Sequence, residues 1–143
     1  MRRERIIDWQ AQLNGYITDA QSRYKESGLV WGEFDCCTFA FDWVHLCTGL
    51  DPMKPLRGKY SSQDEALLAL RKHGSGTLKK TVTDLMSAPL PPAQCRRGDI
   101  AYRSEEKALG IIINQGHQMV AVFLSEGGFS VLPTRQVDCG FPV

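Results

Sequence analysis

The chain has 143 residues, of which 43% are hydrophobic and 23% are charged, and its formal net charge is +1 at pH 7. These values are typical of a globular domain that can bury a core of its own, and the longest apolar runs are too short to span a bilayer. A nearly neutral charge gives no support for binding to nucleic acid or to an anionic membrane surface. We therefore predict a single domain over residues 1–143, with no membrane span and no nucleic-acid partner.

The first part of the chain, to about residue 88, is predicted to be helical. Between about residues 4 and 24, apolar side chains recur at three- and four-residue steps, which is the pattern of an amphipathic helix. A second helix is expected to begin after Asp35, a favourable N-cap residue, and to run to about Thr48. Gly49 follows as a C′ residue that ends this helix.

Two shorter helices follow. Ser62 and Glu65 have the spacing of a capping box, which predicts a helix that ends near His73. Residues 77–86 are expected to form another. Prolines then stiffen the chain and mark a change of character, at positions Pro89, Pro91 and Pro92.

The last part of the chain, from about residue 98 to 143, is predicted to be an antiparallel β meander. Short apolar segments rich in β-branched residues are separated by Gly-, Asn- and Ser-containing turns, at residues 100–102, 109–113, 119–124 and 129–132. Helices followed by a meander indicate the α+β class. We expect the N-terminal helices to pack on a small antiparallel sheet or half-barrel.

The chain has five cysteines: Cys36, Cys37, Cys47, Cys95 and Cys139. None of them forms a Cys-x-x-Cys pair, so neither a zinc ribbon nor another metal or cofactor site is predicted. An odd number of cysteines is most simply explained by free thiols in a reducing cytoplasm. A metal or iron–sulfur site built from these scattered cysteines stays open as an alternative.

Cys36 is the candidate nucleophile. With Asp35 as N-cap it becomes the first helical residue, where the positive end of the helix dipole lowers a thiol pKa. The alternative role is that of a small buried apolar residue. Asp99, in a Gly-Asp pair, is expected to brace a strand turn, and Trp31 to belong to the core or to a groove wall.

These residues lie in two short segments. Residues 34–39 have the sequence Phe-Asp-Cys-Cys-Thr-Phe, and residues 97–102 have the sequence Arg-Gly-Asp-Ile-Ala-Tyr. Together they resemble the Asp-Cys-Ser-Gly-Leu nucleophile motif and the Pro-Gly-Asp-Leu-Val-Phe strand of the NlpC-type branch of the papain-like cysteine peptidases. Residues 109–112, Leu-Gly-Ile-Ile, are similar to the His-Val-Gly-Ile strand of that family.

The resemblance is closer to the short members of this family that are encoded in bacteriophage tail modules. It rests on three further segments, Trp31-Gly32, Thr48-Gly49-Leu50-Asp51-Pro52 and Arg57-Gly58-Lys59-Tyr60, and spans roughly residues 29–135. It implies a papain-like fold and a tail-tip protein, made in the host bacterial cytoplasm and carried in the virion tail. The implied partners are other tail proteins and the peptide stems of peptidoglycan, cleaved during cell-wall penetration for DNA entry.

The resemblance also assigns roles to site residues. Cys36 takes the place of the nucleophile, supported by Asp35, Asp99 and Trp31. The family histidine, which acts as the base, matches Ala108 in this chain, and the residue that orients it falls near Val120. The catalytic dyad is therefore incomplete under this alignment.

His117 is the remaining candidate base. If the strand pairing slips so that residues 119–122 match the family strand, His117 lies two residues upstream and faces the thiol. Otherwise it is a solvated turn residue. His45 lies about half a turn off the Cys36 face, and His73 is expected to end a surface helix, where a cation is structurally favourable. Three functions thus stay open: a peptidoglycan endopeptidase, a catalytically degenerate structural or adaptor component of the tail tip, and a cysteine-ligated metal protein.

Overall fold

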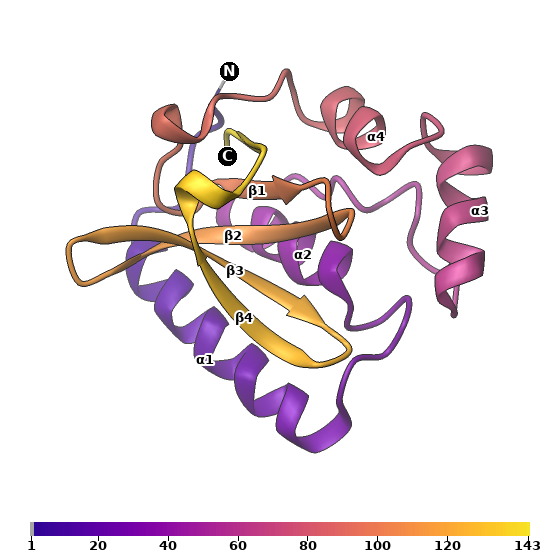
Figure 1. The fold of residues 1–143 in the computed structure, drawn as a ribbon, viewed down its shortest axis with the longest axis horizontal. Coiled ribbons are helices and arrows are strands. Elements are labelled where there is room, and N and C mark those ends of the chain that lie inside the picture. Colours follow the sequence, from indigo (N-terminus) through magenta and orange to yellow (C-terminus); the bar gives the residue numbers. More distant parts are fainter. Residues whose placement is uncertain (1) are drawn as a thin grey trace.

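The computed structural model describes residues 2–143, in which four α-helices and a five-stranded antiparallel sheet form an α+β fold, as predicted (Figure 1). The helices are α1 (Trp9–Ser27), α2 (Cys36–Thr48), α3 (Gln63–His73) and α4 (Leu78–Leu85). The strands are β1 (Ile100–Arg103), β2 (Ala108–Gln115), β3 (Gln118–Ser125), β4 (Gly128–Pro133) and β5 (Cys139–Phe141). None of the helices in this described part has the length and apolar character that a membrane crossing requires.

The ends of α2 follow from its capping residues. The Asp35 carboxylate accepts a hydrogen bond from the Thr38 N–H at 2.9 Å, and the Thr38 hydroxyl accepts one from the Asp35 N–H at 2.8 Å. Such a reciprocal pair satisfies backbone donors that a helix start leaves free. Gly49 ends the helix in the left-handed conformation, with φ of 80°. Both predicted boundaries of α2 are confirmed.

Helix α1 begins at Trp9, so the prediction of a helix from about Glu4 was wrong at its start. The residues before Trp9 are held in another conformation by contacts that periodicity does not show. Arg2 and Arg5 both donate to the Asp99 carboxylate, and the Ile6 N–H donates to the Cys47 carbonyl at 2.9 Å. These bonds fix the segment against the C-terminal end of α2.

The sheet has the strand order β4-β3-β2-β1-β5, and all neighbours are antiparallel. The first four strands form the predicted meander. The sequence pattern does not predict β5, a three-residue strand that returns to the edge beside β1 and pairs Phe141 with Ile100. It follows the short helical turn Thr134–Gln136, and its place beside β1 keeps the C-terminal residues next to the N-terminal segment.

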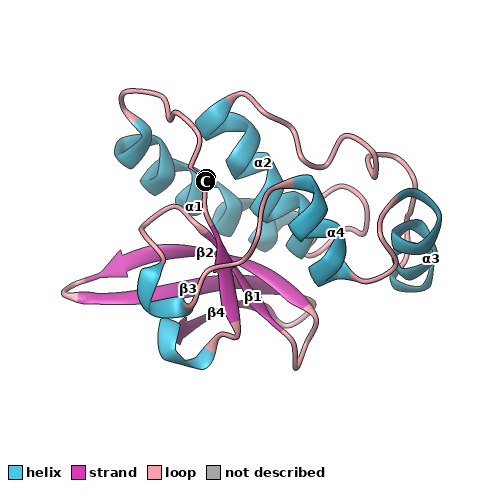
Figure 2. Cartoon of the chain, turned by 90° about the horizontal axis from the view of Figure 1, so that it is seen from above, coloured by secondary structure: helices cyan, strands magenta, loops and turns pink. Residues whose placement is uncertain are grey.

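The two faces of the sheet bury different clusters, because successive strand residues point to opposite sides. One face packs against α1 and α2 and contributes Ile100, Ile111 and Val122 to the main core. Figure 2 shows these helices on one side of the sheet, with α3 beyond its edge. The other face buries a smaller cluster: Ala101, Ile112, Ala121, Phe123 and Val137.

Asp99 joins the two ends of the chain to the sheet. Its carboxylate has no solvent-exposed surface and accepts hydrogen bonds from Arg2 at 2.5 Å, from Arg5 at 3.0 Å and from two backbone groups. The Arg96 N–H donates at 2.7 Å, which braces the strand turn as predicted, and the Val143 N–H donates at 3.1 Å. A buried carboxylate is tolerated when it is paired and hydrogen-bonded in this way.

We predict that Asp99→Ala lowers the free energy of unfolding by about 3–5 kcal/mol, because it leaves the Arg5 guanidinium buried without its counter-charge. Urea unfolding followed by tryptophan fluorescence measures the change. Asp19→Ala, at an exposed position on α1, is the control and should change stability by less than about 0.5 kcal/mol. Equal stability of the two variants would contradict the role given to Asp99.

Candidate functional site

The candidate site lies at the N-terminal end of α2, where Asp35 is almost fully buried at 1% exposure. Besides capping the helix, its carboxylate accepts hydrogen bonds from the Gly32 N–H at 2.8 Å and from the Tyr60 hydroxyl at 2.7 Å. The carboxylate therefore joins three pieces of the chain: the Trp31-Gly32 turn, the start of α2 and the segment that ends at Tyr60.

Gly32 makes this junction sterically possible. Its φ of +86° is one that L side chains rarely adopt, and a Cβ atom on Gly32 would lie 2.2 Å from the Tyr60 carbonyl oxygen. The backbones at positions 32 and 60 therefore approach too closely for any residue but glycine. Tyr60 was not among the predicted site residues, and the sequence signal for it was its place in the Arg57–Tyr60 segment.

The thiol of Cys36 is half-buried and lies 4.0 Å, sulfur to sulfur, from the thiol of Cys37. A hydrogen bond with Cys37 is the main influence that lowers the pKa of Cys36; burial opposes it, and the Leu109 backbone adds a second hydrogen bond that lowers it. The pKa of Cys37 is raised well above its usual range by the same bond and by burial. The pair therefore favours a thiolate on Cys36 and a proton on Cys37.

The strand that faces Cys36 is β2, at its first residues. The Leu109 backbone reaches the thiol, and the Leu109 side chain belongs to the main core on which α2 packs. The preceding residue, Ala108, points to the opposite face of the sheet, where it packs against the smaller cluster. Val120, the predicted orienting position, is a buried residue of β3 paired with Ile113. The position that the resemblance aligns with the family base is therefore an alanine whose side chain faces away from α2.

His117 is not brought to Cys36. It is exposed in the turn between β2 and β3, beyond Gln115 at the opposite end of β2 from Leu109. That strand length corresponds to roughly 20 Å at about 3.3 Å per residue. The slipped pairing that would place His117 near the thiol is not formed, because β2 occupies that position. His45, in the last turn of α2, is also exposed.

Trp31 and Asp99 have different surroundings from each other. The Trp31 indole N–H donates to the Glu126 carboxylate at 3.4 Å, and the ring lines a small cavity with Cys37 and Tyr60. This cavity has a volume of about 30 Å³, room for one or two water molecules and far less than the roughly 300 Å³ or more of a ligand pocket.

Asp99 lies near Trp43, whose indole N–H donates to the Gly98 carbonyl. Trp43 is about two helical turns along α2 from Cys36.

All five cysteines are free thiols. Over residues 2–143, no three His, Cys, Asp or Glu side chains are grouped so that they could hold a metal ion. The cysteine-ligated metal alternative therefore has no ligand group in this part of the chain.

The fold and the site define an α+β protein that presents a cysteine of lowered pKa at a capped helix start. Residues 4–143 match a family described as a domain of unknown function, DUF6950, and the chain belongs to that family. No curated protein and no solved structure matches the chain significantly.

Gly32 provides a test of the junction at Asp35. Gly32→Ala should destabilise the protein through its left-handed φ, by about 1–2 kcal/mol, and through the contact with Tyr60, by about 1–3 kcal/mol more. Gly58→Ala is a matched control, since Gly58 also has a positive φ, of 72°, but has open space at the Cβ position. Thermal or urea unfolding compares the two, and an equal loss of stability would contradict the close contact at Gly32.

The thiol pair provides a second test. Alkylation of Cys36 by iodoacetamide, followed by peptide mass mapping across a pH series, should have a midpoint below the usual thiol value of about 8.5. Cys37→Ala removes the hydrogen bond that lowers this pKa most, so the midpoint should rise. Cys47→Ala, at a buried position outside the pair, should leave it unchanged. A midpoint unaffected by Cys37→Ala would rule out the assigned coupling.

Proposed function

We propose that this chain is an NlpC-type, papain-like protein of the bacteriophage tail tip that acts as a structural or adaptor component and has lost the catalytic dyad. The observation that carries the proposal is that the position where the family resemblance expects the base is Ala108, at the start of β2, and that His117 lies at the far end of this strand. Hydrolysis of a peptide bond by a cysteine needs a group that transfers a proton to the leaving amine.

The fold assignment within this proposal is supported by the arrangement of the motif segments. The cysteine opens a helix, α2, that packs on an antiparallel sheet, and the Gly-Asp segment opens the first strand of that sheet. The next strand begins beside the thiol. This order and these contacts agree with what the resemblance implies for the nucleophile helix and the first two strands.

The other polar groups near the thiol are poor substitutes for a histidine. The Asp35 carboxylate is occupied by Thr38, Gly32 and Tyr60. Burial, reinforced by the nearby Cys37 and Asp35, raises the pKa of Tyr60 far above neutrality. Cys37 holds its proton too tightly to exchange it near neutral pH. Each of these groups is therefore locked in one protonation state or in one set of hydrogen bonds.

The role in the tail tip is taken from the resemblance to short proteins of phage tail modules. On this proposal the protein is made in the cytoplasm of the host bacterium, binds neighbouring tail proteins and is carried in the virion tail. The second candidate function is a peptidoglycan endopeptidase that cuts wall peptides during DNA entry. The lowered pKa of Cys36 favours this second function, because a thiolate is the attacking form of the nucleophile.

Two measurements separate the functions. Release of soluble peptides from purified peptidoglycan, detected by mass spectrometry, should be at background for the wild type and equal to that of Cys36→Ala and His117→Ala. In the phage that encodes the chain, deletion of its gene should abolish infectious tails, whereas Cys36→Ala should assemble tails and infect normally.

Peptide release by the wild type that is lost in Cys36→Ala would overturn the structural role and support the endopeptidase. If His117→Ala also abolished release, the base would lie at a position that the fold keeps far from the thiol, and a rearranged active state would be required. Normal tails after deletion of the gene would remove the assignment to the tail.

A further inference from the structure

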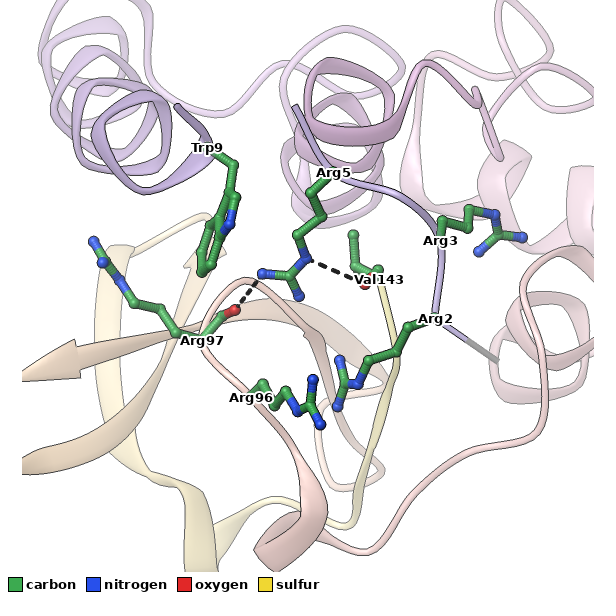
Figure 3. Close-up of a pocket in the computed structure, with 7 residues that line it drawn as sticks. All are labelled: Arg2, Arg3, Arg5, Trp9, Arg96, Arg97 and Val143. Atoms are coloured by element: carbon green, nitrogen blue, oxygen red, sulfur yellow. Dashed lines mark hydrogen bonds between the residues drawn. The ribbon is translucent and has the colours of Figure 1, made fainter. Parts of the chain in front are cut away.

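A second concave region lies at the other end of α2 from Cys36. It is a cleft of about 370 Å³ between the N-terminal segment, the turn before β1 and the C-terminal residue (Figure 3). Its lining consists of five arginines and two apolar residues: Arg2, Arg3, Arg5, Arg96, Arg97, Trp9 and Val143. From Cys36 to Cys47, whose carbonyl binds the Ile6 N–H at this end, α2 extends roughly 16 Å. The proposed tail function makes no use of this cleft.

The cleft carries a concentrated positive charge. The lining has five guanidinium groups and no carboxylate side chain, and the buried Asp99 behind it pairs with two of them. In Figure 3 the groups of Arg2, Arg5 and Arg96 gather on one side of Trp9, whereas that of Arg97 lies beyond the ring and that of Arg3 points away. Arg97 donates to Asn14 and Arg3 to the Met86 carbonyl. The three gathered groups and Asp99 leave an excess of two positive side-chain charges at the cleft. Burial lowers the pKa of Arg5, Asp99 opposes that shift, and the neighbouring charges of Arg2 and Arg96 lower the pKa further. Like charges brought together in this way cost free energy that a bound anion would offset.

The arginines divide into fixed and unused donors. Arg5 is fixed: its Nε donates to the Val143 carbonyl at 3.2 Å and its Nη1 to the Arg97 carbonyl at 2.7 Å, while its Nη2 contacts Asp99. Arg96 has an exposed side chain with no hydrogen-bond partner among residues 2–143. In Figure 3 the guanidinium groups of Arg96 and Arg2 point toward one another across the cleft. An anion between them would meet donors from both.

Trp9 keeps the cleft in shape. Its ring stands between Arg5 and Arg97, whose guanidinium carbons lie 4.3 Å and 5.8 Å from its centroid. Stacking on an aromatic ring holds a guanidinium plane without using its N–H donors. The Nε of Arg97 is buried and has no hydrogen-bond partner in the described chain. The cleft is thus preorganised, which reduces the entropy lost when a ligand binds.

We propose that this arginine cleft binds a small ligand that carries one or more phosphate groups. A guanidinium fork matches both carboxylate and phosphate oxygens in a bidentate manner. Phosphate is favoured by charge density, since each group brings up to two negative charges and three acceptor oxygens, whereas a carboxylate brings one charge and two oxygens. The cleft has a volume of about 370 Å³, in the lower range of small-molecule pockets, so the ligand is expected to be small and to carry its negative charge in few groups.

Isothermal titration calorimetry of the full chain with inorganic tripolyphosphate, at constant ionic strength, tests the proposal. Arg96→Gln should weaken binding about tenfold or more, since it removes a charge-assisted contact without disturbing a structural bond. Arg96→Lys keeps the charge but loses the fork, and should give an intermediate affinity. Arg71→Gln, at an exposed position in the last turn of α3, is the charge-matched control and should bind like the wild type.

Absence of tripolyphosphate binding by the wild type would overturn the proposal. Equal weakening in Arg96→Gln and Arg71→Gln would also overturn it, since the binding would then reflect overall charge. Citrate, a carboxylate anion of high charge, should bind more weakly than tripolyphosphate, and equal affinity would refute the preference for phosphate. Tighter binding of a short DNA duplex, per phosphate, would assign the cleft to a phosphodiester polymer instead of a small ligand. None of these outcomes depends on the role of Cys36.

Discussion

The buried carboxylate of Asp99 is the interaction on which the arrangement of this fold depends most. It holds the N-terminal segment through Arg2 and Arg5, the turn before β1 through the Arg96 N–H, and the C-terminal residue through the Val143 N–H. A carboxylate without solvent contact is stable only while all these partners remain in place. The meeting of both ends of the chain at the sheet, and the arginine cleft above it, are consequences of this one requirement.

Local signals in the sequence were sufficient where structure is decided within a few residues. The cap at Asp35 and the stop at Gly49 each involve residues within one helical turn, and the meander after the prolines pairs strands that follow one another in the chain. The structure confirms all three predictions. The start of α1 and the strand β5 were missed, because both depend on pairings between residues far apart in the sequence. Arg5 contacts a residue 94 positions away, and β5 owes its place to the edge of β1. Periodicity carries no information about such contacts.

The candidate site divides in the same way. The position of Cys36 at a helix start follows from one N-cap residue, and the sequence was enough to predict it. Whether His117 reaches the thiol depended on which strand faces α2. That choice is fixed by packing: β2 fills the position, and the rest of this strand separates Leu109 from the turn that carries His117. The sequence segment that contains Tyr60 was noted, but its role at the site was not predicted, since its bond to Asp35 spans 25 positions.

An Asp-Cys pair at a helix start is usually taken as a sign of catalysis, but here the aspartate is fully explained by structure. Asp35 caps α2, accepts the Tyr60 hydroxyl and holds the Gly32 turn, and none of these bonds involves the thiol. The Trp31-Gly32 and Arg57–Tyr60 segments meet at this carboxylate, so the resemblance they carry is accounted for by the junction they build. Since the fold needs these residues whether or not Cys36 reacts, their presence is evidence for the scaffold. Evidence for hydrolysis would have to come from a base near the thiol, and the position where the resemblance expects that base is Ala108.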